Sequence, residues 1–88
     1  MESPVKMIRC RHALSRKELA HLAGVSYQSV YRAEVGLVQH PYDRIVQTLA
    51  VLGHDPDVIR GEHAEFIRQL AQHAMAKARG TTDGLPGA

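Results

Sequence analysis

The segment from Leu14 to Gly36, LSRKELAHLAGVSYQSVYRAEVG, decides the fold that this sequence predicts. Ser15 and Glu18 make an S-x-x-E capping box, a pattern that marks the start of a helix. Gly24 ends that helix, because glycine takes a left-handed cap conformation at no steric cost. The sequence therefore predicts a short helix over residues 16–23.

A second short helix is expected over residues 27–34, directly after a capping serine, Ser26. Val30 and Ala33 form its inner face, and Val25 is an apolar residue inside the turn that can fill the gap between the helices. Two short helices joined in this way form a helix-turn-helix pattern. The second helix would then offer a polar and aromatic outer face to a partner.

Prolines, capping residues and glycines place the other helices. One helix begins at Pro4, and another runs from Pro41 to Leu52. A further helix begins at Asp55-Pro56, where an aspartate cap precedes a proline at the first helical position. The residues expected to face the core from these helices are Val5, Ile8, Cys10, His12, Ile45, Leu49, Leu52, Val58 and Ile59.

The last predicted helix runs from about Glu62 to Arg79. Gly61 is expected to break or kink the chain before it, and Gly80 to stop it. Its apolar stripe at helical spacing consists of Phe66, Ile67, Leu70, Ala71, Ala74, Met75 and Ala78. Three uses of this stripe are open: extra core, pairing with a second copy, and binding of another protein.

Composition indicates one small all-helical domain. The net charge is only +2 with a pI near 9.0, but residues 1–44 hold seven basic and four acidic side chains. The positive charge thus accompanies the helix-turn-helix pattern. Cys10 is the single cysteine, so no internal disulfide is expected. No membrane span or signal peptide is visible, which predicts a cytoplasmic protein.

The run L-S-x-x-E-L-A-x-x-A-G-V-S-x-x-S-V-x-x-x-E-x-G resembles the Cro/C1-type (XRE-like) helix-turn-helix family, which includes phage repressors and many small bacterial regulators. The resemblance covers about Val5 to Ile59, and the spacing from Gly36 to Gly53 also follows the family. It implies an all-α, compact five-helix, lambda-repressor-like DNA-binding domain with an additional C-terminal amphipathic helix. The second helix of the motif would enter the DNA major groove.

The resemblance also implies roles for individual residues, and their chemistry agrees with those roles. The positions that read bases are Tyr27, Gln28, Tyr31 and Arg32, which lie on one helix face at i, i+4 spacing. The positions beside the DNA backbone are Arg16, Lys17, Ser26 and Ser29. Arg9 and Glu34 occupy positions that form a structural ion pair in the family. Glutamine can pair bidentately with adenine, and arginine with guanine.

The chain departs from the family in the loop after the motif. Leu37, Val38 and Gln39 stand where relatives often carry basic residues, and Val35 replaces the usual asparagine. Both changes remove phosphate contacts, so weaker DNA affinity or greater reliance on dimerisation is expected. The apolar side chains either form an exposed protein contact or fold back onto the next helix.

Because the family domain is nearly complete by Ile59, the spare apolar stripe of the last helix favours a dimer. The expected dimer or partner interface consists of Phe66, Ile67, Leu70, Ala74 and Met75. The expected organisation is a helix-turn-helix domain over residues 1–60, an amphipathic helix over residues 61–79 and a flexible tail over residues 80–88.

The function expected from this sequence is a sequence-specific, DNA-binding transcription regulator, most simply a repressor that binds a pseudo-palindromic operator as a homodimer. It would be cytoplasmic, and associated with the nucleoid when bound to double-stranded DNA. The alternatives are an antitoxin or phage control protein that acts with a protein partner, and a protein–protein adaptor. No enzyme, cofactor or metal site is expected, because no nucleophile–base set is visible and the six histidines lack ligand spacing.

Overall fold

The computed structural model describes residues 2–83, with side chains as far as residue 78. This part of the chain is all helical and contains no strand, which confirms the predicted fold class at that level. The five helices are α1 (Pro4–Arg11), α2 (Arg16–Ala23), α3 (Tyr27–Val35), α4 (Asp43–Val51) and α5 (Pro56–Asp83).

Local capping contacts fix the first three helices where the sequence predicts them. The Ser3 hydroxyl accepts a hydrogen bond from the Lys6 amide at 3.1 Å, so α1 begins at the following proline. Both bonds of the Ser15–Glu18 capping box are present, at 2.9 and 3.0 Å. Gly24 ends α2 with φ +67°, a left-handed conformation that favours glycine.

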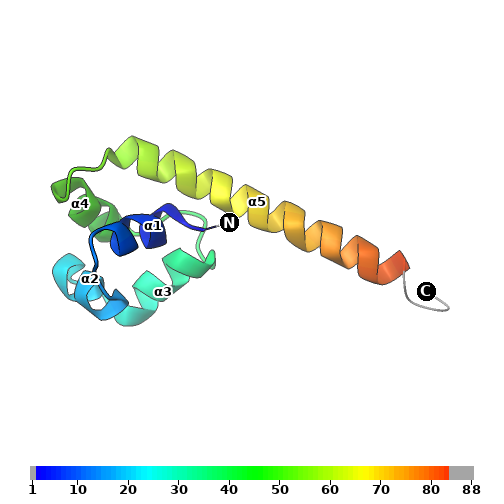
Figure 1. Cartoon of the computed structure of the whole chain (residues 1–88), viewed down its shortest axis with the longest axis horizontal. Coiled ribbons are helices and arrows are strands. Elements are labelled where there is room, and N and C mark those ends of the chain that lie inside the picture. Colours follow the sequence, from blue (N-terminus) through cyan, green and yellow to red (C-terminus); the bar gives the residue numbers. More distant parts are fainter. Residues whose placement is uncertain (1, 84–88) are drawn as a thin grey trace.

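The helices enclose one apolar core, to which α1 to α4 and the first part of α5 all contribute (Figure 1). The fully buried side chains of this core are mainly branched aliphatics, because the sequence contains no tryptophan and few other aromatic residues to fill it. The core residues that expose less than a tenth of their surface to solvent are Val5, Ile8, Leu19, Ala20, Ala23, Val30, Ala33, Ile45, Val46, Leu49 and Ile59.

Three residues expected in the core are not there. Cys10 and His12 are exposed, and so is Val58. Cys10 lies two residues after the buried Ile8 and therefore on the opposite side of α1. His12 is the C-terminal cap of α1, outside the helix, and Val58 is turned about 100° round α5 from the buried Ile59.

α4 begins at Asp43, two residues later than predicted. Tyr42 is its cap and has an extended backbone, with φ −61° and ψ 138°, so Pro41 belongs to the connection from α3. Pro41 is buried there, which accounts for a proline at this position without a helix start. At the other end, Gly53 has φ +101° and turns the chain toward α5.

α5 is one continuous helix, and the predicted break at Gly61 is wrong. A glycine inside a helix costs only about 1 kcal/mol relative to alanine, which neighbouring helical residues can offset. The expected boundary between residues 60 and 61 therefore falls within a helix. Gly80 does not end the helix, which continues to Asp83; the rest of the predicted tail, residues 84–88, lies outside the described residues.

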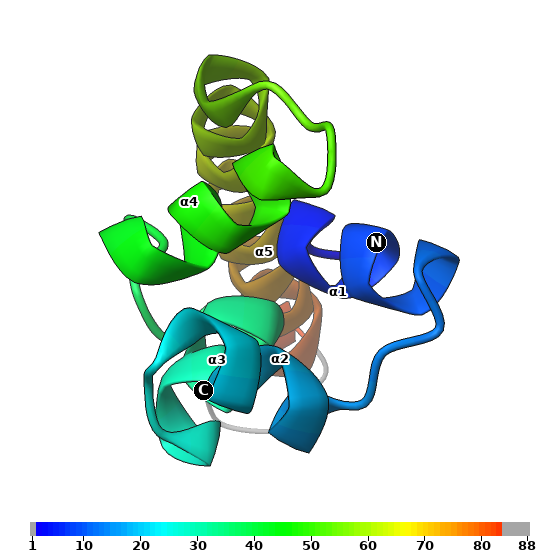
Figure 2. The same cartoon turned by 90° about the vertical axis from the view of Figure 1, so that its left-hand side faces the viewer.

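The apolar stripe of α5 divides into two parts. Phe66 is buried, and Ile67 and Leu70 are half-buried, because all three pack over the Gly36 end of α3. Beyond them α5 projects away from the other helices, as Figures 1 and 2 show. Met75 is 61% exposed there, and Ala74 is exposed too. None of the described helices is long and apolar enough to cross a membrane.

Candidate nucleic-acid interface

The outer face of α3 is polar, aromatic and open to solvent. Tyr27 and Tyr31 are 44% and 38% exposed, and Gln28 and Arg32 are also exposed. Val30 and Ala33, on the opposite side of the same helix, are fully buried. α2 and α3 lie together along one edge of the molecule (Figure 2). All four predicted base-reading residues of α3 are exposed.

A buried carboxylate lies directly beneath this face. The Glu34 side chain is inaccessible to solvent and accepts hydrogen bonds from Arg9 Nε at 2.6 Å and Arg9 Nη2 at 3.0 Å. Arg9 Nη1 also donates to the Leu14 carbonyl at 2.8 Å. The predicted ion pair is thus present, and it joins α1, the connection after it and α3.

Arg16 also belongs to this ion cluster, which the sequence reasoning missed. Its Nε donates to Glu34 Oε1 at 3.0 Å, and its guanidinium carbon lies 5.3 Å from the centre of the Tyr31 ring. The neighbouring Tyr27 hydroxyl and the Glu34 carboxylate raise the pKa of Arg16 above its ordinary value. Arg16, the predicted phosphate ligand, is therefore held between Glu34 and the Tyr31 ring of α3.

The pKa of Arg9 is likewise raised, chiefly by its hydrogen bonds to Glu34. Both guanidinium groups consequently stay charged at every working pH. Two cations share one buried carboxylate, so the cluster keeps an excess of positive charge close to α3.

A shallow hollow of about 560 Å³ opens beside this cluster, between the start of α2 and the start of α3. The N-terminal end of α2, which is the positive end of its helix dipole, lies at the edge of this hollow. The lining of the hollow combines three basic side chains with two hydroxyl groups, a set of donors suited to an anion. The lining residues are Arg9, Ser15, Arg16, Lys17 and Tyr27.

The turn between α2 and α3 is held by residues from outside it. Arg44 of α4 donates from Nη1 to the Gly24 carbonyl at 3.2 Å. Ser26 accepts from the Ser29 amide at 3.2 Å, and the two hydroxyls lie 3.0 Å apart. Ser26 therefore caps α3, and only the remaining hydrogen-bonding capacity of the two hydroxyls is available to a phosphate.

The apolar residues at the end of α3 and in the loop after it behave differently, and each of the two interpretations left open by the sequence applies to some of them. Val38 is half-buried against the core, while Leu37 is 67% exposed and Val35 is 37% exposed. The Val38 carbonyl accepts a hydrogen bond from Nε2 of the fully buried His63 at 2.9 Å. His63 lies three residues before Phe66 in α5, and this spacing was the sequence signal for a second inward-facing residue.

The predicted interface on the last helix is partly used within the chain. Phe66 is buried, and Ile67 and Leu70 pack over Gly36, so these three residues are unavailable as a wide contact face in this conformation. Ala74 and Met75 remain open. Within residues 2–78, no group of three or more histidine, cysteine, aspartate or glutamate side chains is arranged to hold a metal ion.

No protein-family model, curated protein or solved structure matches this chain.

Proposed function

We propose that this protein is a sequence-specific DNA-binding transcription regulator of the Cro/C1 (XRE-like) type, with a lambda-repressor-like domain. The observation that carries the proposal is the open face of α3, where two tyrosines, a glutamine and an arginine stand together beside a basic hollow. The two tyrosines on this nine-residue helix offer a partner both aromatic surface and hydroxyl groups.

In this proposal α3 lies in the major groove. Gln28 pairs with an adenine edge and Arg32 with a guanine edge, because amide and guanidinium groups match those bases bidentately. Tyr27 and Tyr31 contact a thymine methyl group or a phosphate. Arg16 braces Tyr31 by its cation–π contact, so its contribution is to orient the reading face as well as to attract phosphate.

The DNA backbone is contacted from the hollow at the start of α2. Lys17 is exposed there, and the positive dipole end of α2 favours a bound anion. Ser26 and Ser29 offer their hydroxyls from the turn. Since phosphate contacts position a protein without reading sequence, this part of the surface supplies affinity and salt dependence.

We further propose a homodimer that acts as a repressor in the cytoplasm, on the nucleoid. Two copies of α3 would read half-sites about one helical turn, roughly 34 Å, apart. The projecting half of α5, with Ala74 and Met75 exposed, supports pairing between copies outside the globular part. Bound at a promoter, such a dimer would exclude polymerase.

Selection from a random duplex library, followed by titration at two salt concentrations, tests this proposal. A palindromic consensus with a steep salt slope is the expected result. Alanine at Gln28 or Arg32 should cost about 1–3 kcal/mol at one defined base pair, whereas alanine at Lys17 should weaken binding equally on all sequences. Equal weakening on every sequence by the Gln28 and Arg32 variants would contradict base reading.

A second function is favoured by one observation, the 67% exposure of Leu37 next to the reading helix. An exposed leucine at the loop where basic residues would serve DNA binding fits an antitoxin, a phage control protein or an adaptor with a protein partner. Co-purification with a small neighbouring protein, lost in the Leu37→Ser variant, together with no salt-dependent DNA binding, would favour that function.

A further inference from the structure

Two histidines that are 42 residues apart in sequence meet on the surface away from α3. His12 caps the end of α1, and His54 lies in the turn between α4 and α5. Their Nε2 atoms are 2.9 Å apart, and their rings are nearly perpendicular, with centroids separated by 5.2 Å. Only one proton can lie between the two nitrogens, so one ring donates and the other accepts.

We propose that His12 and His54 form a binding site for a divalent transition-metal ion that prefers imidazole ligands, such as zinc. Each ring would supply its Nε2 lone pair. The proton on the donating Nε2 would move through solvent to Nδ1 of the same ring, so both rings ligate as neutral imidazoles. No charge on the protein changes in this exchange.

The geometry requires only a small movement. Two Zn–N bonds of about 2.05 Å at a tetrahedral angle place the nitrogens about 3.3 Å apart, roughly 0.4 Å more than their separation here. His12 is exposed and His54 is half-exposed, so their rings can separate and turn by rotation about side-chain bonds. The helices that carry them need not move.

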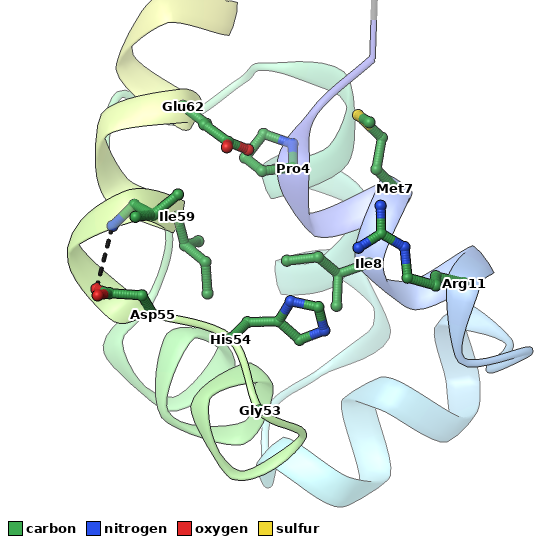
Figure 3. A pocket seen from close by; sticks show the side chains of 10 residues that line it. Pro4, Met7, Ile8, Arg11, Gly53, His54, Asp55, Ile59 and Glu62 are labelled. Carbon is green, nitrogen blue, oxygen red and sulfur yellow. Dashed lines mark hydrogen bonds between the residues drawn. The ribbon is translucent and has the colours of Figure 1, made fainter.

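The surroundings of His54 suit a cation with open coordination positions. A cavity of about 280 Å³ adjoins it between α1 and α5, and Figure 3 shows the His54 ring directed from the turn toward α1 beneath Ile8. The charged lining residues are Arg11, Asp55 and Glu62, so carboxylates outnumber guanidinium groups.

Such an ion would join the end of α1 to the turn before α5. These segments come together only in the folded chain, so the ion would bind the native state in preference to the unfolded state. Zinc would therefore raise the melting temperature, by an amount that grows with the logarithm of the zinc concentration divided by its Kd.

Calorimetric titration of the full chain with zinc chloride tests this inference. The Cys10→Ser variant serves as the background, because the exposed Cys10 thiol on α1 is itself a zinc ligand. We expect one zinc per chain. His12→Gln and His54→Gln should each weaken binding by at least about tenfold, while the exposed His21 and His40 provide matched controls whose glutamine variants bind as the background does.

Nuclear magnetic resonance of the histidine rings gives an independent readout if a variant folds poorly. Zinc should shift the ring signals of His12 and His54 selectively in the background protein. Absence of zinc binding at millimolar concentration, or an equal loss of affinity in the His21 and His40 controls, would overturn the proposal. Zinc-dependent association of chains with no change at the two rings would overturn it as well.

Discussion

Replacement of Glu34 by glutamine is the perturbation that best probes the construction of the α3 face. The Glu34 side chain has no solvent access, and three hydrogen bonds from Arg9 and Arg16 at 2.6–3.0 Å converge on its carboxylate. Glutamine keeps the shape but removes the charge, and its amide group would turn two N–H donors toward guanidinium groups that can only donate.

The loss of unfolding free energy depends on how well water can solvate the two arginines once the carboxylate is gone. Removal of one partner of a buried ion pair costs about 3–5 kcal/mol, because the other charge is left without compensation. Arg9 and Arg16 are 12% and 29% exposed, so hydration recovers part of that energy, and we expect the lower end, about 3 kcal/mol. In a domain of this size that loss lowers the melting temperature by roughly 12–24 °C.

Urea unfolding followed by circular dichroism measures this loss directly. The matched control is Glu2→Gln, which removes the exposed Lys6–Glu2 pair on α1 and should cost less than about 1 kcal/mol. A loss below about 1 kcal/mol for Glu34→Gln would refute the reasoning, since the cluster would then behave as a surface ion pair. Replacement of Arg9 and Glu34 together by methionine should cost less than replacement of Glu34 alone.

Three further predictions concern other parts of the chain. The pKa of Glu18 is lowered chiefly by the hydrogen bond from the Ser15 backbone amide and further by the Ser15 side chain. Its contribution to stability is therefore present above the ordinary glutamate pKa and is lost as the pH falls through the lowered value. Carboxyl titration by nuclear magnetic resonance should show that Ser15→Ala raises the Glu18 pKa only part of the way to the ordinary value, because alanine keeps the backbone amide. Gly36→Ala should lower the free energy of unfolding by about 1–3 kcal/mol more than Gly53→Ala does. A Cβ at Gly36 would collide with the α5 side chains packed on it, whereas Gly53 has open space around it. Equal losses of free energy in chemical unfolding would contradict that packing. A stop codon after Gln72 should change the melting temperature by only a few degrees, since α5 is exposed beyond that point. The same truncation should reduce dimer formation, measured by sedimentation velocity, if Met75 lies in the dimer interface.

The sequence by itself determined α2, α3 and the turn between them. The contacts that set their ends, such as Ser15 with Glu18 and the glycine conformation at Gly24, join residues at most four positions apart. Such contacts form whatever the rest of the chain does, so capping rules placed both helix starts correctly. The exposed face of α3 followed directly from helical periodicity.

The same local rules failed where a longer-range contact competed with them. Pro41 has the chemistry of a helix start, but burial of the proline in the connection after α3 moves the start of α4 to Asp43. Gly61 has the chemistry of a helix break, but α5 continues through it because Ile59 and Phe66, on either side, are both buried against the core. Packing outweighed propensities worth about 1 kcal/mol.

Only the tertiary structure decided which distant side chains meet. The Arg16 guanidinium turned toward Glu34 and Tyr31, Phe66 and Leu70 closed over Gly36, and His12 met His54 across 42 positions of sequence. The helices are separated by short connections whose exact path sets which side chains approach within hydrogen-bonding distance. Because hydrogen bonds act over about 3 Å, a pattern that fixes each helix but not the packing between helices leaves such contacts undetermined.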